Sequence, residues 1–220
     1  MTQLLNRRSI LQTTGAGIAL TALSGCFSGD ENSASTDASG RSEGKQAQPG
    51  PLKEMTLGDV NAPIKVVEYA SMTCPHCASF HNLTYHALKE KYIDTGKVLF
   101  AFREFPLDQL AATVSVLARC APEDKFFNVI DVFFKTQSKW RSSQNPLAEI
   151  TEITKQLGFT QQSVEKCLQN QEVIDGINTI RKHGIEVMKV EATPSFYING
   201  KKISGALTID QFDKEFEGLL

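Results

Sequence analysis

The sequence has little cysteine, little imbalance of charge and no apolar stretch long enough for a membrane-spanning helix. Five cysteines among 220 residues are too few for a disulfide-stapled scaffold. A net charge of −2 gives no basic surface of the kind that nucleic acid requires, so we expect no nucleic-acid partner. A chain that is 41% hydrophobic and 22% charged is not collagen, a coiled-coil rod, a fully disordered chain or a polytopic membrane protein. What remains is a globular protein of one large or two small domains.

The first 26 residues contain no acidic side chain, and their only charged residues are Arg7 and Arg8. An apolar, small-residue run follows over residues 15–25. It is shorter than the roughly 20 residues that a bilayer-spanning helix needs. A positive flank, a short apolar stretch and small residues at its end predict a secretory signal peptide over residues 1–25.

Two short motifs refine this prediction. Residues 6–12 resemble the twin-arginine export signal, and Sec export is the alternative route. Residues 23–26 read Leu-Ser-Gly-Cys and resemble a bacterial lipobox, which implies acylation of Cys26 and a membrane lipid anchor. The alternative is a soluble export signal with an incidental cysteine. Residues 26–50 are mostly small and polar, and we predict that they form a flexible tether.

From residue 51 onward the hydrophobic patterns predict an α/β protein. Residues 64–70 and 98–102 are rich in β-branched and aromatic side chains, which predicts two strands. The segment over residues 75–94 is long enough for a helix between them. A strand, a helix and a second strand at this spacing indicate parallel strands.

The second half of the chain combines helices with a short hairpin. Apolar residues at helical spacing predict helices over residues 108–188, with breaks at Pro122, Pro146 and Gly158. Asn199-Gly200 lies between two strand-like runs and predicts a hairpin turn, and a last helix is expected over residues 208–216. The expected organisation is a core of residues 51–107 and 189–220, interrupted by a helical insertion at 108–188.

A Cys-x-x-Cys motif stands where the first predicted strand leads into its helix: Cys74, Pro75, His76 and Cys77. Haem attachment needs a histidine directly after the second cysteine, and that residue is alanine. A structural zinc site needs two further ligands close together, but the remaining cysteines lie far apart in the sequence. We therefore interpret the pair as a redox dithiol that holds no metal. Metal binding by the two thiols is the alternative from a different class.

The position of the motif predicts different roles for its two thiols. Pro75 suits the first turn of a helix, which places Cys74 at the helix N-terminus. Unpaired N–H groups and the positive end of the helix dipole favour the thiolate there, and His76 adds a positive or hydrogen-bonding neighbour. A lowered pKa would make Cys74 the reactive sulfur and its disulfide a strong oxidant. Cys77, one turn later and less exposed, is the predicted resolving thiol.

Glu68 lies in the first predicted strand, six residues before Cys74. Strand alternation puts its carboxylate on an apolar face, where it would be partly desolvated. We interpret it as the proton acceptor for Cys77, and a salt-bridged strand residue is the alternative. His81 and His86 are interpreted as solvated or packed helix residues.

Two segments carry a family resemblance. Residues 67–77 and 192–200 resemble the active-site segments of DsbA-like thiol:disulfide oxidoreductases. The resemblance covers about residues 51–220 and implies a thioredoxin-like α/β fold with an inserted helical domain. It implies that Cys74 is the nucleophile, Cys77 the resolving thiol and Glu68 a buried acid. It also implies a cis peptide bond before Pro194, with Thr193 and Pro194 facing the cysteines and contacting the substrate backbone. Ala192 departs from the family pattern, in which glycine is common.

The remaining cysteines, Cys120 and Cys167, both fall in phase with apolar helix positions. In an oxidising compartment we expect them to form a structural disulfide, and two separate buried thiols are the alternative.

The sequence thus predicts an exported, lipid-anchored dithiol oxidase of the bacterial cell envelope. We expect no cofactor and a monomeric protein. Its partners would be reduced or unfolded exported proteins and a membrane reoxidant of the DsbB type. A disulfide reductase or isomerase is the alternative within the same class.

Overall fold

The computed structural model describes residues 47–220. The predicted signal peptide over residues 1–25 and the predicted acylation site Cys26 lie outside the described residues. Of the predicted tether over residues 26–50, only residues 47–50 are described, and they belong to no helix or strand. No helix within the described range is both long and apolar enough to cross a membrane.

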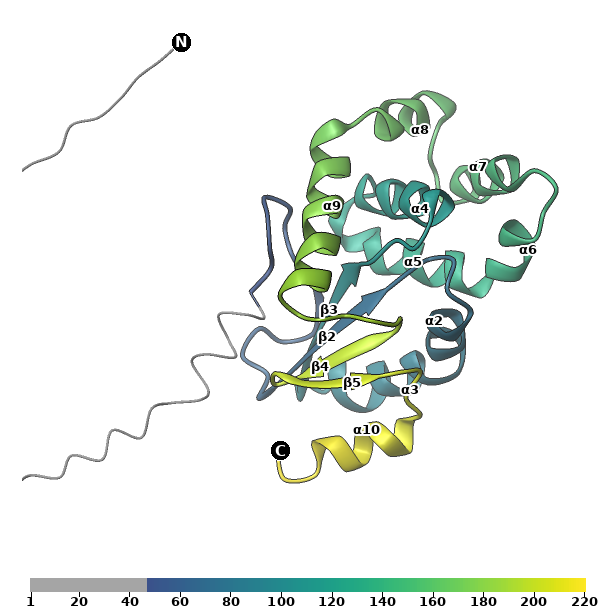
Figure 1. Ribbon diagram of the computed structural model, residues 1–220. Coiled ribbons are helices and arrows are strands. Elements are labelled where there is room, and N and C mark those ends of the chain that lie inside the picture. Colours follow the sequence, from purple (N-terminus) through teal and green to yellow (C-terminus); the bar gives the residue numbers. More distant parts are fainter. Residues whose placement is uncertain (1–46) are drawn as a thin grey trace, which may run out of the picture. The chain divides into compact units, whose positions relative to one another are not determined.

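A five-stranded mixed sheet forms the centre of the described structure (Figure 1). Its strands are β1 (Met55–Leu57), β2 (Ile64–Ala70), β3 (Val98–Glu104), β4 (Ser195–Ile198) and β5 (Lys201–Ser204). Their order across the sheet is β1-β3-β2-β4-β5. Strands β2 and β3 are parallel, as predicted, and the other neighbours are antiparallel. The three-residue edge strand β1 was not predicted, because it is too short to show an alternating pattern.

The β4–β5 hairpin turns at Asn199 and Gly200, which both have positive φ angles of 44° and 93°. Such angles are favourable for asparagine and glycine, and they match the right-handed twist of the two strands. The hairpin prediction is therefore confirmed. The hairpin positions the site because its first strand, β4, pairs directly with the central strand β2. Residues 192–194 lead into β4.

Helices connect the strands and supply the inserted block. Between β2 and β3 lie α2 (Pro75–Phe80), the π-helical turn η1 (His81–Tyr85), α3 (His86–Leu88) and a second π-helical turn η2 (Lys89–Ile93). Between β3 and β4 lie α4 (Gln109–Arg119), the 3₁₀ turn η3 (Glu123–Lys125), α5 (Phe126–Lys135), α6 (Gln137–Arg141), α7 (Pro146–Gln156), α8 (Gln161–Leu168) and α9 (Gln171–Glu186). Helix α10 (Ile209–Phe216) ends the chain. The predicted α/β fold interrupted by helices is confirmed.

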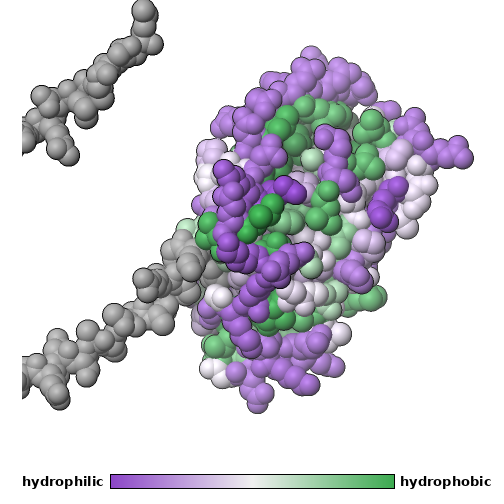
Figure 2. All heavy atoms as spheres, in the orientation of Figure 1, coloured by the Kyte–Doolittle hydropathy of each residue, from purple (hydrophilic) through white to green (hydrophobic). Residues whose placement is uncertain are grey.

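The two faces of the sheet are packed by different elements. Val67 and Tyr69 of β2 lie in an apolar cluster with Ile180 of α9. Ile64 and Val66, on the opposite face, belong to the larger cluster that includes α2, α4, α5 and α10. Figure 2 shows hydrophobic residues reaching the surface in separate patches between hydrophilic ones. Because alternate residues of β2 face opposite sides, Glu68 points into the larger cluster, toward the helix that carries the cysteines.

Candidate active site

Cys74 occupies the N-cap position of α2, at the end of the turn that leads out of β2. Its backbone is extended, with φ −76° and ψ 121°, and Pro75 takes the first helical position, where no N–H is needed. The Cys77 backbone N–H donates to the Cys74 sulfur across 3.4 Å. The sulfur therefore takes the place that a serine or aspartate oxygen has in an ordinary N-cap.

The inserted helices hold this turn in place through two side chains. Gln137 of α6 is buried and donates from Nε2 to the carbonyl oxygens of Met72 and Cys74, at 2.8 and 2.9 Å. The Thr73 hydroxyl donates to Asp108 across 2.6 Å, and Asp108 also caps α4. The cysteine-bearing turn is thus connected to the helical block at two points. Neither contact could be predicted from the sequence, because each joins residues more than 30 positions apart.

The Cys74 thiol is the acidic member of the pair. A hydrogen bond from the Cys77 side chain is the largest cause that lowers its pKa, to about 5. Burial opposes this shift, while the Thr193 side chain and the backbone N–H groups of Cys77 and His76 add to it. The His76 ring is exposed, so its contribution comes through the backbone. At neutral pH Cys74 is therefore a thiolate in the reduced protein.

Cys77 has the opposite character. It is fully buried, and burial raises the pKa of its thiol well above the ordinary value. The hydrogen bond to Cys74 and the negative charge of Glu68 act in the same direction. A sulfur that leaves as a thiolate at this position must take up a proton, because the charged form is strongly disfavoured there.

Titration of the Cys74 thiolate tests this asymmetry. In a Cys77→Ser variant we expect thiolate absorbance to appear with a midpoint near pH 5, because the serine hydroxyl still donates to the sulfur. A Cys77→Ala variant removes that donor and serves as the matched comparison, with a higher expected midpoint. A midpoint near the ordinary thiol value of about 8.5 in the serine variant would contradict the assignment.

The loop before β4 lies against Cys74. The Thr193–Pro194 peptide bond is cis. The Cys74 sulfur lies 3.2 Å from the Thr193 carbonyl oxygen, to which it donates when it is protonated, and Thr193 is 8% exposed. The structure therefore brings together two segments that are 119 positions apart in the chain.

Glu68 lies beneath the helix, fully buried. Its Oε2 is 3.0 Å from Nε2 of His81, which is also buried. His86, by contrast, is 62% exposed and pairs with Asp131 on the surface. The interpretation of the two histidines as solvated or packed residues holds, but it missed the direct contact between His81 and Glu68.

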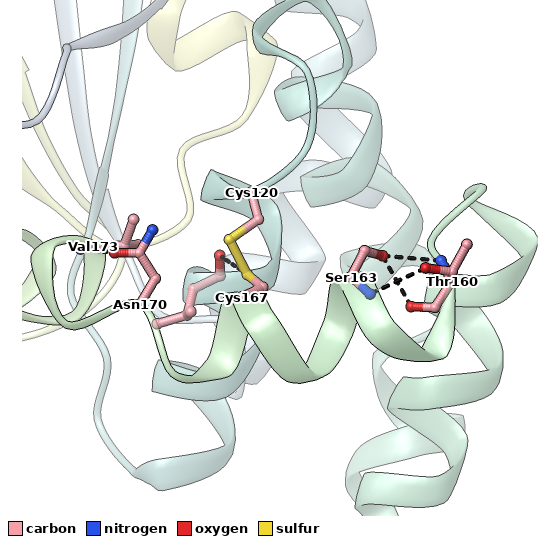
Figure 3. Close-up of a disulfide and its surroundings, with 7 residues drawn as sticks. Cys120, Thr160, Ser163, Cys167, Asn170 and Val173 are labelled. Atoms are coloured by element: carbon pink, nitrogen blue, oxygen red, sulfur yellow. Dashed lines mark hydrogen bonds between the residues drawn. A yellow bond between two sulfur atoms is a disulfide. The ribbon is translucent and has the colours of Figure 1, made fainter.

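Cys120 and Cys167 form a disulfide that joins the end of α4 to α8 (Figure 3). The Cys167 sulfur also lies 3.2 Å from the Val116 carbonyl oxygen. At its other end α8 begins with a reciprocal capping box, in which Thr160 and Ser163 each accept from the other's backbone N–H. Both ends of this eight-residue helix are therefore held, one covalently and one by hydrogen bonds.

Among the described residues, no group of three or more histidine, cysteine, aspartate or glutamate side chains is arranged to hold a metal ion. The cysteines that the structure leaves free within this range are Cys74 and Cys77.

Comparison with known proteins places this arrangement in a family. A family model described as thioredoxin matches residues 52–217. A Rickettsia bellii protein, provisionally named a protein-disulfide oxidoreductase, is 36% identical over 67% of this chain and 57% of its own length. The chain thus spans little more than half of the curated relatives that it matches first. The probable disulfide bond formation protein D of Bacillus anthracis is 28% identical over 67% of this chain and 70% of its own length.

The crystal structure of alpha-DsbA1 from Wolbachia pipientis superimposes with a TM-score of 0.73 at 29% identity. The alignment covers 80% of this chain and 94% of that one. The match to the family model includes both segments that carry the resemblance in the sequence, residues 67–77 and 192–200. This chain belongs to the thioredoxin family, in the DsbA-like form that carries a helical insertion.

Proposed function

We propose that this protein is a thiol:disulfide oxidase that introduces disulfide bonds into exported proteins. The observation that carries the proposal is the asymmetry between a thiolate-forming Cys74 and a buried Cys77. Stabilising the Cys74 thiolate stabilises the reduced protein, and this makes the Cys74–Cys77 disulfide easy to reduce. A disulfide that is easily reduced passes its bond on to other thiols. The names of the relatives that the chain matches are consistent with this chemistry.

The reaction proceeds in two exchanges. A substrate thiolate attacks Cys74, the Cys74–Cys77 bond breaks, and Cys77 leaves with the electron pair and takes up a proton. A second substrate thiolate then attacks the substrate sulfur of the mixed disulfide, and Cys74 leaves as its stable thiolate. The substrate gains a disulfide and the protein holds two electrons as a dithiol. We propose that a membrane partner of the DsbB type removes those electrons.

Substrate recognition in this proposal uses the surface around Cys74. Thr193 and Pro194 lie beside the sulfur and can align an extended peptide backbone, which would tolerate many sequences. Leu107 is 53% exposed, and its backbone N–H donates to Ser71 in the cysteine-bearing turn. An apolar side chain at this place suits partners that have not yet buried their own apolar residues.

We propose further that export and acylation at Cys26 place the protein at the envelope membrane as a monomer. The predicted signal peptide and lipobox support this localisation. Incorporation of labelled fatty acid into the native chain, but not into a Cys26→Ala variant, would test it directly.

Equilibration with glutathione tests the direction of electron flow. We expect the Cys74–Cys77 disulfide to open at low ratios of reduced to oxidised glutathione, because the product thiolate is stabilised. A disulfide that stays closed under these conditions would contradict the oxidase and favour a reductase. Parallel assays of insulin reduction, oxidation of a reduced protein and metal content of the reduced protein separate oxidase, reductase and metal carrier.

A further inference from the structure

His81 occupies an enclosed aromatic site directly behind the cysteine pair. Its ring stacks on Phe134 of α5, with centroids 4.2 Å apart and planes at 21°. Tyr85 lies next to it at 4.9 Å and Phe102 of β3 at 6.0 Å. The side chain is 1% exposed, and its polar contact within the described structure is with Glu68.

Glu68 and His81 each keep one polar atom without a protein partner. Glu68 Oε2 and His81 Nε2 form a hydrogen bond with each other. Glu68 Oε1 and His81 Nδ1 are buried without a hydrogen bond within the described structure. An unsatisfied buried polar atom costs about 1–3 kcal/mol, so two of them in one pair are not explained by packing.

The surroundings limit which groups can exchange a proton with this pair. Cys77 of α2 is the neighbouring thiol, and the Glu68 charge acts on it. Tyr85 of η1 is kept neutral because burial raises its pKa. The side chains that face the pair from β3, β4 and α5 are Phe102, Phe196 and Phe134, which carry no charge. Glu68 and His81 are therefore the buried titratable pair from which we expect Cys77 to take its proton.

We propose that Glu68 and His81 act as one proton-sharing unit, in which His81 is a positioning residue that supplies Glu68 with the proton for Cys77. This inference rests on the exchange chemistry of the proposed function and names a residue that the sequence reasoning left without a role. Imidazole is a side chain that can both accept and donate a proton through its ring nitrogens, so His81 can pass a proton to the Glu68 oxygen that it contacts.

Before attack, Glu68 and His81 share one proton. As the substrate thiolate bonds to Cys74, the electron pair of the disulfide passes to the Cys77 sulfur, and the shared proton moves through Glu68 to that sulfur. Glu68 is left ionised and His81 neutral, so the negative charge of the attacking thiolate ends on the pair. Closure of the disulfide reverses each transfer.

The pH profile of disulfide opening in the full-length protein tests the proposal. We expect His81→Gln to slow single-turnover reduction by dithiothreitol by about tenfold near neutral pH, which is less than the roughly 10²–10⁴-fold loss of a general acid that acts directly, because Glu68 itself remains. Rates are corrected for the thiolate fraction of the reductant, and the variant should lose one titration step of the native profile. His86→Gln, a change of the same size on the exposed surface, is the matched control and should leave the profile unchanged.

Two further measurements exclude a merely structural effect. In a Glu68→Gln background, His81→Gln should cause little further change, because the two residues act in series. In the native protein, nitrogen NMR of the His81 ring should show a proton present in the disulfide form and released in the dithiol form. An unchanged profile in His81→Gln, or equal ring protonation in both redox forms, would overturn the proposal. These measurements monitor the opening of the Cys74–Cys77 disulfide, a step that oxidases and reductases share. If the protein proved to be a reductase, the proposed function would be refuted but this inference would not.

Discussion

Alkylation at neutral pH is expected to be at least about a hundredfold faster at Cys74, in a Cys77→Ser variant, than at Cys77 in a Cys74→Ser variant. A thiol with a pKa of about 5 is almost entirely thiolate at neutral pH. One with a pKa well above 9.0 has less than about one part in a hundred as thiolate. Cys77 is also the more deeply buried of the two, at 0% exposed against 6% for Cys74, which adds to the difference. The measurement is the rate of iodoacetamide adduct formation, followed by mass.

The same variants separate the two roles in exchange. Cys74→Ser should lose all disulfide transfer. Cys77→Ser should accumulate a mixed disulfide with a substrate or glutathione, because no neighbouring thiol remains to displace the partner. Comparable reactivity of the two single thiols would mean that the pair is not polarised. The oxidase mechanism would then lack its driving force.

Loss of the Cys120–Cys167 disulfide is expected to lower the free energy of unfolding by about 4 kcal/mol. The bond closes a loop with a sequence separation of 47, and the stabilisation follows from the reduced freedom of the unfolded chain. The loss would be large beside the net stability of an ordinary domain, about 5–15 kcal/mol. Urea unfolding measures it.

The design must isolate this bond from the redox pair. A Cys74→Ser, Cys77→Ser double variant leaves Cys120 and Cys167 as the cysteines of the described range. Unfolding of that protein with and without reductant then reports on the one bond. Equal stability under both conditions would show that the two thiols are separate.

Local patterns accounted for much of the fold. Strand alternation in β2 correctly placed Glu68 on the same face as Ile64 and Val66, toward α2. The Asn199-Gly200 pair correctly predicted the hairpin. The first prediction depends on the two-residue period of a strand, and the second on a turn between residues that are adjacent in sequence.

What the sequence did not reveal depends on contacts between distant segments. Gln137 holds the cysteine-bearing turn from 63 positions away, and nothing in its own helix marks it for that role. His81 lies in the predicted helix over residues 75–94, where we expected a solvated or packed side chain. The contact that matters instead joins His81 to a strand, and it exists only after the helix has packed on the sheet.

The two π-helical turns between β2 and β3 also restrict the length of this segment. Buried residues recur there every four positions, as in Cys77, His81 and Tyr85. In a regular α-helix four residues exceed a full turn by about 40°, so the buried side would drift around the axis. The wider π turns offset that drift. Deleting a single residue from either turn would return that turn to regular α-helical winding, and the buried positions would then no longer stay in line. Point substitutions in this helix should therefore be tolerated far more often than insertions or deletions.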